Sequence, residues 1–105
     1  MSLKFHDSPF HVTHDEKIAT KMAMKMDLSM MISALIKEKR WTQSQAAEIL
    51  DVNQSRISDL KNAKIEKFTI DALIDMLELL SFKVTFTMTS FEQALISIEK
   101  DKVED

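Results

Sequence analysis

Polar side chains that match the edges of DNA bases gather in the segment from residue 54 to residue 62. Its outward positions are Gln54, Ser55, Arg56, Ser58 and Asp59, followed by Lys61 and Asn62. Glutamine can bond adenine through two atoms, arginine can do so with guanine, and serine or a carboxylate can reach other base edges. A surface that serves solubility alone would carry more lysine and glutamate. The segment therefore predicts base recognition, with a plain helical hairpin in a small bundle as the alternative.

Two short helices in succession are expected to hold these side chains. Thr42 and Gln45 form a capping box that opens the first helix. Asp51 is expected to end it in the left-handed conformation. Asn53 is expected to cap the second helix, and Asn62 to end it in the same left-handed way. Two helices joined by a turn of about three residues form the unit whose second helix enters the major groove.

Longer elements flank this pair of helices. No helix breaker lies between Asp15 and Arg40, and apolar residues recur there at helical spacing, which predicts a long first helix. We expect its many methionines to fill the core rather than to form an adaptable binding surface. Thr69 caps a further helix over residues 70–80. Ser90 with Gln93 forms another capping box and predicts a short C-terminal helix.

A strand is expected between the last two helices. Apolar side chains alternate there with polar ones, and the apolar positions are Phe82, Val84, Phe86 and Met88. A single strand leaves its backbone donors and acceptors unpaired, and an exposed apolar edge invites pairing. The economical solution is antiparallel pairing with the same strand of a second copy. We therefore predict a homodimer that buries these four side chains between subunits.

Composition and charge fit this interpretation. The chain has 105 residues, enough for one domain, with no glycine, no cysteine and a net charge of −3. The absence of glycine disfavours extensive tight-turned β structure, and the absence of cysteine excludes disulfides and thiolate zinc sites. Residues 1–16, 17–67, 68–89 and 90–105 carry −2, +4, −2 and −3, which together give −3. The positive charge that attracts phosphate thus coincides with the candidate DNA-binding elements.

The sequence from Thr42 to Leu60, TQSQAAEILDVNQSRISDL, resembles the helix-turn-helix of the XRE family, which has the lambda-repressor/Cro-like fold. Within it, SRISDL, followed by KIEKFTIDAL, is similar to the branch that includes HigA-type antitoxins. The resemblance covers roughly residues 17–88. Asp51 and Asn62 stand where that family usually has glycine. The resemblance implies a mainly all-α bundle of about five helices with one C-terminal β-strand pairing across a dimer.

Site roles follow from the resemblance, position by position. Gln54 would reach an adenine edge, with Ser55, Arg56, Ser58 and Asp59 beside it. Asp59 would either accept a hydrogen bond from cytosine or pair with Arg56, and we favour the pair within the helix. Gln43 would touch a phosphate or brace Gln54. Other phosphate contacts would come from Lys61, Asn62, Lys64, Lys67 and the N–H groups that follow Thr69.

The expected organisation is an arm over residues 1–14, a helix-turn-helix domain with its strand over 15–89, and a short helix and tail over 90–105. His6, His11 and His14, with Asp7 and Asp15, could be arranged as metal ligands, but solvated histidines in an arm are the better interpretation. No side chains are spaced for catalysis, so we predict no enzyme and no cofactor. No membrane span or signal peptide is indicated, which favours the cytoplasm.

Two classes of function fit these expectations. The first is a transcriptional repressor that binds double-stranded operator DNA as a dimer, and the antitoxin of a toxin-antitoxin pair would also bind a toxin protein. The second is a helical protein-interaction module that binds a partner without specific DNA binding.

Overall fold

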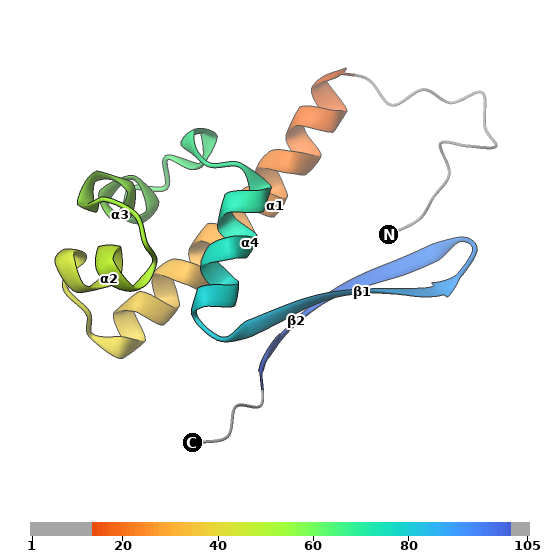
Figure 1. Cartoon of the computed structure of the whole chain (residues 1–105). Coiled ribbons are helices and arrows are strands. Elements are labelled where there is room, and N and C mark those ends of the chain that lie inside the picture. The colour runs from red at the N-terminus through yellow and green to blue at the C-terminus, as the bar shows by residue number, and fades with distance from the viewer. Residues whose placement is uncertain (1–13, 102–105) are drawn as a thin grey trace.

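The structure of the chain, a computed structural model, describes residues 14–101. Four α-helices come first: α1 (His14–Lys39), α2 (Gln43–Ile49), α3 (Gln54–Lys61) and α4 (Ile70–Leu79), with a 3-10 turn, η1 (Ile65–Lys67), before α4. Two strands follow, β1 (Phe82–Ser90) and β2 (Gln93–Lys100). The long α1 supports the other helices along one part of its length, and the strands extend away from them (Figure 1).

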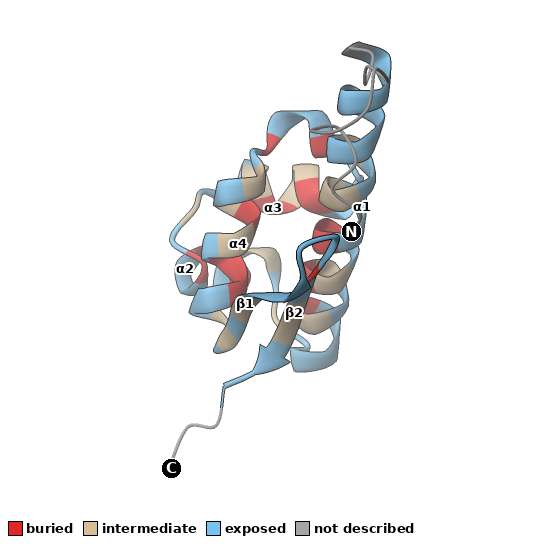
Figure 2. Cartoon of the chain, turned by 90° about the vertical axis from the view of Figure 1, so that its right-hand side faces the viewer, coloured by how far each residue is buried: buried red, intermediate tan, exposed pale blue. Residues whose placement is uncertain are grey.

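The core lies where α1, α3 and α4 face one another (Figure 2). The helical spacing of Leu28, Ile32 and Ile36 gives α1 a buried stripe, as expected for an amphipathic helix. The largest fully buried side chains are Phe68, Ile32, Ile36, Leu50, Ile57, Leu73 and Leu77. Five of them come from α1, α3 and α4, while Leu50 directly follows α2 and Phe68 directly follows η1; α2 itself adds the small Ala46 and Ala47. One continuous cluster therefore fixes α3 against the rest of the bundle.

The predicted caps are present at the starts of three helices. The Thr42 hydroxyl accepts a hydrogen bond from the Gln45 N–H at 3.1 Å, and the Gln45 side chain accepts one from the Thr42 N–H at 2.9 Å. Asn53 caps α3, and Thr69 caps α4. Each cap satisfies backbone donors that an α-helix leaves unpaired at its first turn. Capping therefore fixes where each short helix begins.

Within residues 14–101, left-handed backbone follows each α-helix, at Arg40, Asp51, Ala63 and Ser81. The conformation at Asp51 confirms the sequence prediction, with φ of 57°. The prediction for Asn62 is wrong, because its φ is −93° and Ala63 takes the left-handed conformation instead. The Ala63 N–H donates to the Leu60 carbonyl and the Lys64 N–H to the Asp59 carbonyl, which closes a Schellman motif. That motif requires the left-handed residue one position after the cap residue, Asn62.

The chain after Ser90 is a strand, so the predicted C-terminal helix is wrong and the count of about five helices falls to four α-helices in the described residues. β2 pairs antiparallel with β1, with Phe86 opposite Ile96 and Val84 opposite Ile98. Ala94, Ile96 and Ile98 alternate with Leu95 and Ser97, which is the strand period rather than the helical one. Pairing with β2 satisfies N–H and C=O groups of β1, which would have stayed unpaired if the chain after Ser90 had formed a helix.

The hairpin also corrects the prediction of a single strand that must pair across a dimer. β1 finds its partner within the chain, so residues 90–100 belong to the same hairpin as β1 rather than to a separate tail. Phe82, Val84, Phe86 and Met88 do share one face, as their alternation predicts. Phe82 and Val84 are half-buried, whereas Phe86 and Met88 are exposed. Residues 1–13, with most of the predicted arm, and 102–105 lie outside the described residues.

Replacing Leu77 with alanine should lower the free energy of unfolding by about 2–5 kcal/mol, because this side chain is fully buried and its removal leaves a cavity. Leu79, on the same helix, is 51 % exposed, so Leu79→Ala should cost less than about 1 kcal/mol. Urea denaturation followed by circular dichroism at one protein concentration measures both. Equal losses for the two variants would contradict the assignment of the core.

Candidate nucleic-acid interface

The α2–α3 pair has the arrangement expected of a DNA-binding helix-turn-helix. α3 turns Ile57 and Leu60 into the core, and this orientation leaves Gln54 and Ser55 exposed at its N-terminal end. The N-terminal residues of the second helix are the ones that approach base edges in this mode of docking. Gln54 is thus placed where the sequence predicts a base-contacting side chain.

The start of α3 is organised around the side chain of Asn53. The Oδ1 atom of this side chain accepts hydrogen bonds from the Arg56 N–H at 3.0 Å and from the Ser55 hydroxyl at 2.6 Å. The Ser55 hydroxyl keeps its acceptor capacity for a base or phosphate, because a hydroxyl has two acceptor lone pairs. The predicted brace between Gln43 and Gln54 is not among the hydrogen bonds of the described residues, and Gln43 is half-buried at the start of α2.

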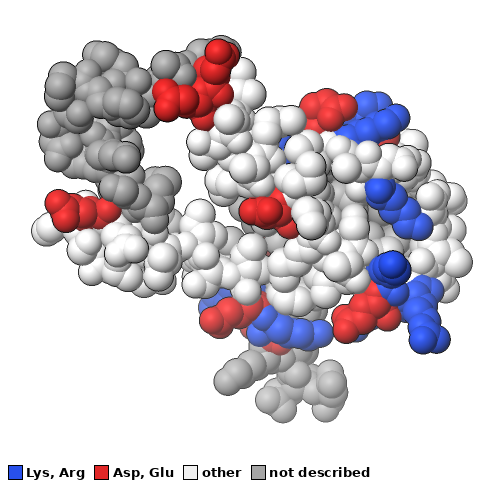
Figure 3. Space-filling model, turned by 180° about the vertical axis from the view of Figure 1, so that it is seen from behind, with Lys and Arg blue, Asp and Glu red and all other residues white. Residues whose placement is uncertain are grey.

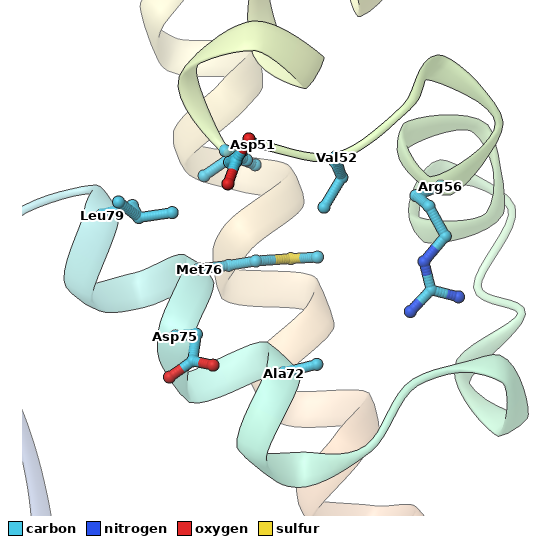
Figure 4. Close-up of a pocket in the computed structure, with 8 residues that line it drawn as sticks. Asp51, Val52, Arg56, Ala72, Asp75, Met76 and Leu79 are labelled. Atoms are coloured by element: carbon cyan, nitrogen blue, oxygen red, sulfur yellow. The ribbon is translucent and has the colours of Figure 1, made fainter.

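Arg56 lies differently from the sequence prediction. Its Nη1 donates to the Lys67 carbonyl oxygen at 2.8 Å, and its guanidinium carbon lies 4.1 Å from the centre of the Phe68 ring. Figure 4 shows this side chain leaving α3 toward the segment that leads into α4. The guanidinium therefore joins α3 to the chain that follows η1, through a hydrogen bond and a cation–π contact. In this structure Arg56 is a bracing residue rather than one directed at a base.

Asp59 also has a partner other than the one expected. Its carboxylate lies 3.9 Å from the Lys67 ammonium, so the favoured pair with Arg56 is wrong. Arg56 is engaged by the Lys67 carbonyl and the Phe68 ring, which draw it away from Asp59. The Lys67 side chain is half exposed, so this ion pair is screened by solvent and contributes little to stability. A phosphate group can therefore compete with Asp59 for Lys67 at low cost.

The remaining predicted site residues lie at the end of α3 and in the chain leading to α4. Lys61, Asn62 and Lys64 are exposed, and the Asn62 amide donates to the Ser58 hydroxyl at 3.4 Å. The Thr69 hydroxyl accepts from the Ala72 N–H at 3.0 Å, so it is used in capping α4. Asp71 in the first turn of α4 already complements the positive end of that helix. A phosphate there would meet a like charge, which weakens the prediction of an anion site at Thr69.

Charged side chains are distributed unevenly over the molecule. On the face seen in Figure 3, basic side chains with acidic ones among them lie over the end opposite the hairpin tip, and the hairpin carries few charges. The net +4 of residues 17–67 includes Lys17, Lys21 and Lys25 in the N-terminal half of α1, so residues 26–67 carry only +1. Attraction of an anionic duplex to the helical end therefore depends on individual basic side chains rather than on a strong net field.

A shallow pocket of about 270 Å³ lies behind the helix-turn-helix, between the α2–α3 turn and α4. Asp51, Arg56 and Asp75 bring both signs of charge to it, and Val52, Met76 and Leu79 form apolar walls (Figure 4). Sequence reasoning missed this junction and the role of Phe68 as a platform for Arg56. The only sequence signal was an aromatic residue directly before the Thr69 cap, and the path of η1 decides where its ring lies.

No group of three metal-binding side chains occurs among residues 14–101. His6, His11 and Asp7 lie outside the described residues, so their predicted solvation stays a prediction. In the described part of the chain, no helix is both long and apolar enough to cross a membrane.

Comparison with known proteins connects this geometry to a family. A family model described as a helix-turn-helix domain matches residues 12–89. A solved structure described as an XRE family transcriptional regulator is similar to this chain at a TM-score of 0.67 and 26 % sequence identity. The similarity covers 84 % of this chain and 99 % of that one. A search of curated proteins found no match.

Replacing Arg56 with alanine should lower the free energy of unfolding by about 1–3 kcal/mol, because it removes a charge-assisted hydrogen bond and a cation–π contact. Lys64→Ala is the matched control, since the exposed Lys64 side chain should contribute within about 0.5 kcal/mol. Denaturant titration measures both. Equal stability of the Arg56→Ala variant and the unmodified protein would argue against a bracing role.

Proposed function

The chain belongs to the helix-turn-helix domain family, and from this membership we propose that it is a sequence-specific transcriptional repressor that binds operator DNA with α3. This family is a class of DNA-binding domains rather than of enzymes. The observation that carries the proposal is the position of Gln54. It is exposed at the start of a short helix that the buried Ile57 fixes against the core.

In the proposed complex, the N-terminal end of α3 enters the major groove. Gln54 bonds an adenine through its amide, and Ser55 contacts a neighbouring base. Ser58 and Asp59 lie further along α3 and are half-buried, so they contact bases only at the margin of the site. Arg56 contributes to DNA binding indirectly. Its guanidinium is bound to the Lys67 carbonyl, and this contact fixes the angle of α3.

The phosphate contacts come from the residues around this helix. Lys61 and Lys64 are exposed beyond the end of α3, and Lys67 gives up its ion pair with Asp59 to a phosphate. Gln43 and Asn62 add further backbone contacts, and a contact at Thr69 is the weakest of those expected from the sequence because Asp71 lies in the first turn of α4. These contacts carry no base information, so they contribute affinity and salt dependence rather than specificity.

We propose that two copies bind a two-fold symmetric operator, with half-sites separated by one helical turn or a multiple of it. The apolar hairpin end, opposite α3, supports an assembly in which both α3 helices face the duplex (Figure 1). The proposed compartment is the cytoplasm, where a protein that binds the operator meets its DNA.

We further propose that this repressor is an antitoxin that regulates its own operon. The support is the similarity of SRISDL and the segment after it to HigA-type antitoxins. The adjacent reading frame distinguishes this proposal from a plain regulator. A small basic protein encoded there that binds this chain would support an antitoxin, and a neighbour that does not bind would contradict it.

The alternative is a helical module that binds a protein partner without specific DNA binding. Fluorescence anisotropy with the DNA upstream of the gene and with random duplex distinguishes the two. A repressor binds the upstream DNA selectively, with affinity that falls steeply as salt rises. Equal weak binding to both duplexes would overturn the repressor and favour the module.

Gln54→Ala should make the free energy of binding to the upstream DNA less favourable by about 1–3 kcal/mol, because the lost contact is to a base. Its binding to random duplex should stay unchanged. Lys64→Ala should weaken binding to both duplexes alike and lower the slope of log K against log salt by about 1, because the lost contact is to a phosphate. Anisotropy titrations at several salt concentrations measure both effects. The same sequence-independent loss for both variants would refute the assignment of Gln54 to base recognition.

A further inference from the structure

An apolar groove opens between the N-terminal half of α1 and the outer part of the hairpin. Its wider part, about 440 Å³, is lined by Met24 and Leu28 from α1 and by Phe86 and Ile96 from the hairpin. A second part of about 170 Å³ continues it toward Ile74 of α4.

The apolar stripe of α1 explains one wall of this groove. Ile36 and Ile32 are covered by the helical bundle, and Leu28 marks the edge of that cover. Met24 lies one turn further on the same side of the helix and is only half-buried. The stripe therefore continues beyond the core that the chain itself provides.

The hairpin presents more apolar surface than a monomer usually exposes. Phe86 is 68 % exposed, Met88 is 56 % exposed, and Phe91 at the turn is 88 % exposed. Ile96, opposite Phe86, adds to this surface, and the exposed Leu95 lies on the other face of the hairpin. Side chains of this size expose roughly several hundred Å² in total, a large part of the roughly 800 Å² per partner in a specific interface. Monomeric proteins rarely leave such a contiguous patch open.

The hairpin has little cover of its own. The sheet of the described residues has two strands, and a two-stranded hairpin needs a packing partner to be stable in water. Among the described residues, Phe82 and Ile98 at the base of the hairpin pack on the core cluster, and Ala94 further out is also buried.

We propose that the groove is filled by the hairpin tip of a second copy, with the partner's Phe91 packed against Met24 and the exchange repeated about a two-fold axis. The groove and the hairpin have the same apolar chemistry, so one surface can complement itself, as a two-fold interface requires. The helical end with α3 is opposite the hairpin tip, so the exchange leaves both α3 helices accessible (Figure 1). This inference rests on the proposed repressor, whose two-fold operator needs a dimer.

Cysteine cross-linking tests the contact directly, because the chain contains no cysteine of its own. Two variants, Met24→Cys and Phe91→Cys, are mixed and oxidised. One of them has a tag that makes it longer, so that a cross-link between the two variants can be distinguished by size. The proposal predicts a cross-linked heterodimer. Lys83→Cys replaces Phe91→Cys in the control, since Lys83 lies at the base of the hairpin on its other face and should give no product. A cross-link from Lys83→Cys but not from Phe91→Cys would overturn the proposal.

Sedimentation equilibrium provides the second measurement. Phe91→Glu should raise the dimer dissociation constant at least about tenfold, because a charge replaces an aromatic anchor. The high exposure of Phe91 means that this variant should keep its fold, which circular dichroism verifies. Lys83→Glu is the control and should change the constant by less than about twofold. A dissociation constant that Phe91→Glu leaves unchanged would overturn the proposal. So would an unmodified protein that is still monomeric at high micromolar concentration.

DNA binding separates failure of this inference from failure of the proposed function. A monomeric chain that still prefers the upstream DNA to random duplex would overturn the groove assignment alone. A dimer that cross-links as predicted but binds all duplexes equally would overturn the repressor and leave the interface intact.

Discussion

The burial of Ile57 and Leu60 is the constraint on which the rest of this structure depends. A helix of eight residues is too short to be stable alone in water, so α3 exists because tertiary packing holds it. Ile57 is fully buried in the cluster that joins α1 and α4. The same burial decides which side chains of α3 face outward. Stability and the proposed recognition of DNA therefore depend on the same helix, and a loss of core packing would also misplace Gln54.

The connection after α3 adds a second level of control over its position. Arg56 bonds the Lys67 carbonyl and stacks on Phe68, which is itself buried. This contact ties α3 to the chain just before α4. A charged side chain is thus used to hold geometry, while the uncharged Gln54 remains at the exposed end. Such a division is favourable because a guanidinium forms strong hydrogen bonds to carbonyl oxygens.

The molecule has two ends with different chemistry. The helical end is capped and closely packed, with basic and acidic side chains on its surface, whereas the hairpin end is largely apolar and exposed (Figures 2 and 3). β1 and β2 pair with each other along one edge each, and their outer edges have no strand partner among the described residues. The exposed apolar side chains of the hairpin still lack a packing partner.

Local signals in the sequence determined the helices and their starts. Thr42, Asn53 and Thr69 act on backbone groups within the next three residues, and the stripe of α1 follows from helical spacing alone. The alternation of residues 82–88 likewise identified β1. These features need no knowledge of distant residues, so they could be predicted. The family resemblance rests on the same local pattern.

Only the tertiary structure decided the partners of Arg56 and the secondary structure of the chain after Ser90. Ser90 and Gln93 fit a helix start equally well, and β1, which ends at Ser90, selected the strand by offering its edge. The path of η1 brought the Lys67 carbonyl and Phe68 to Arg56, eleven and twelve residues away in the sequence. Caps and periodicity act over a few residues, whereas these choices depend on groups that only folding brings together.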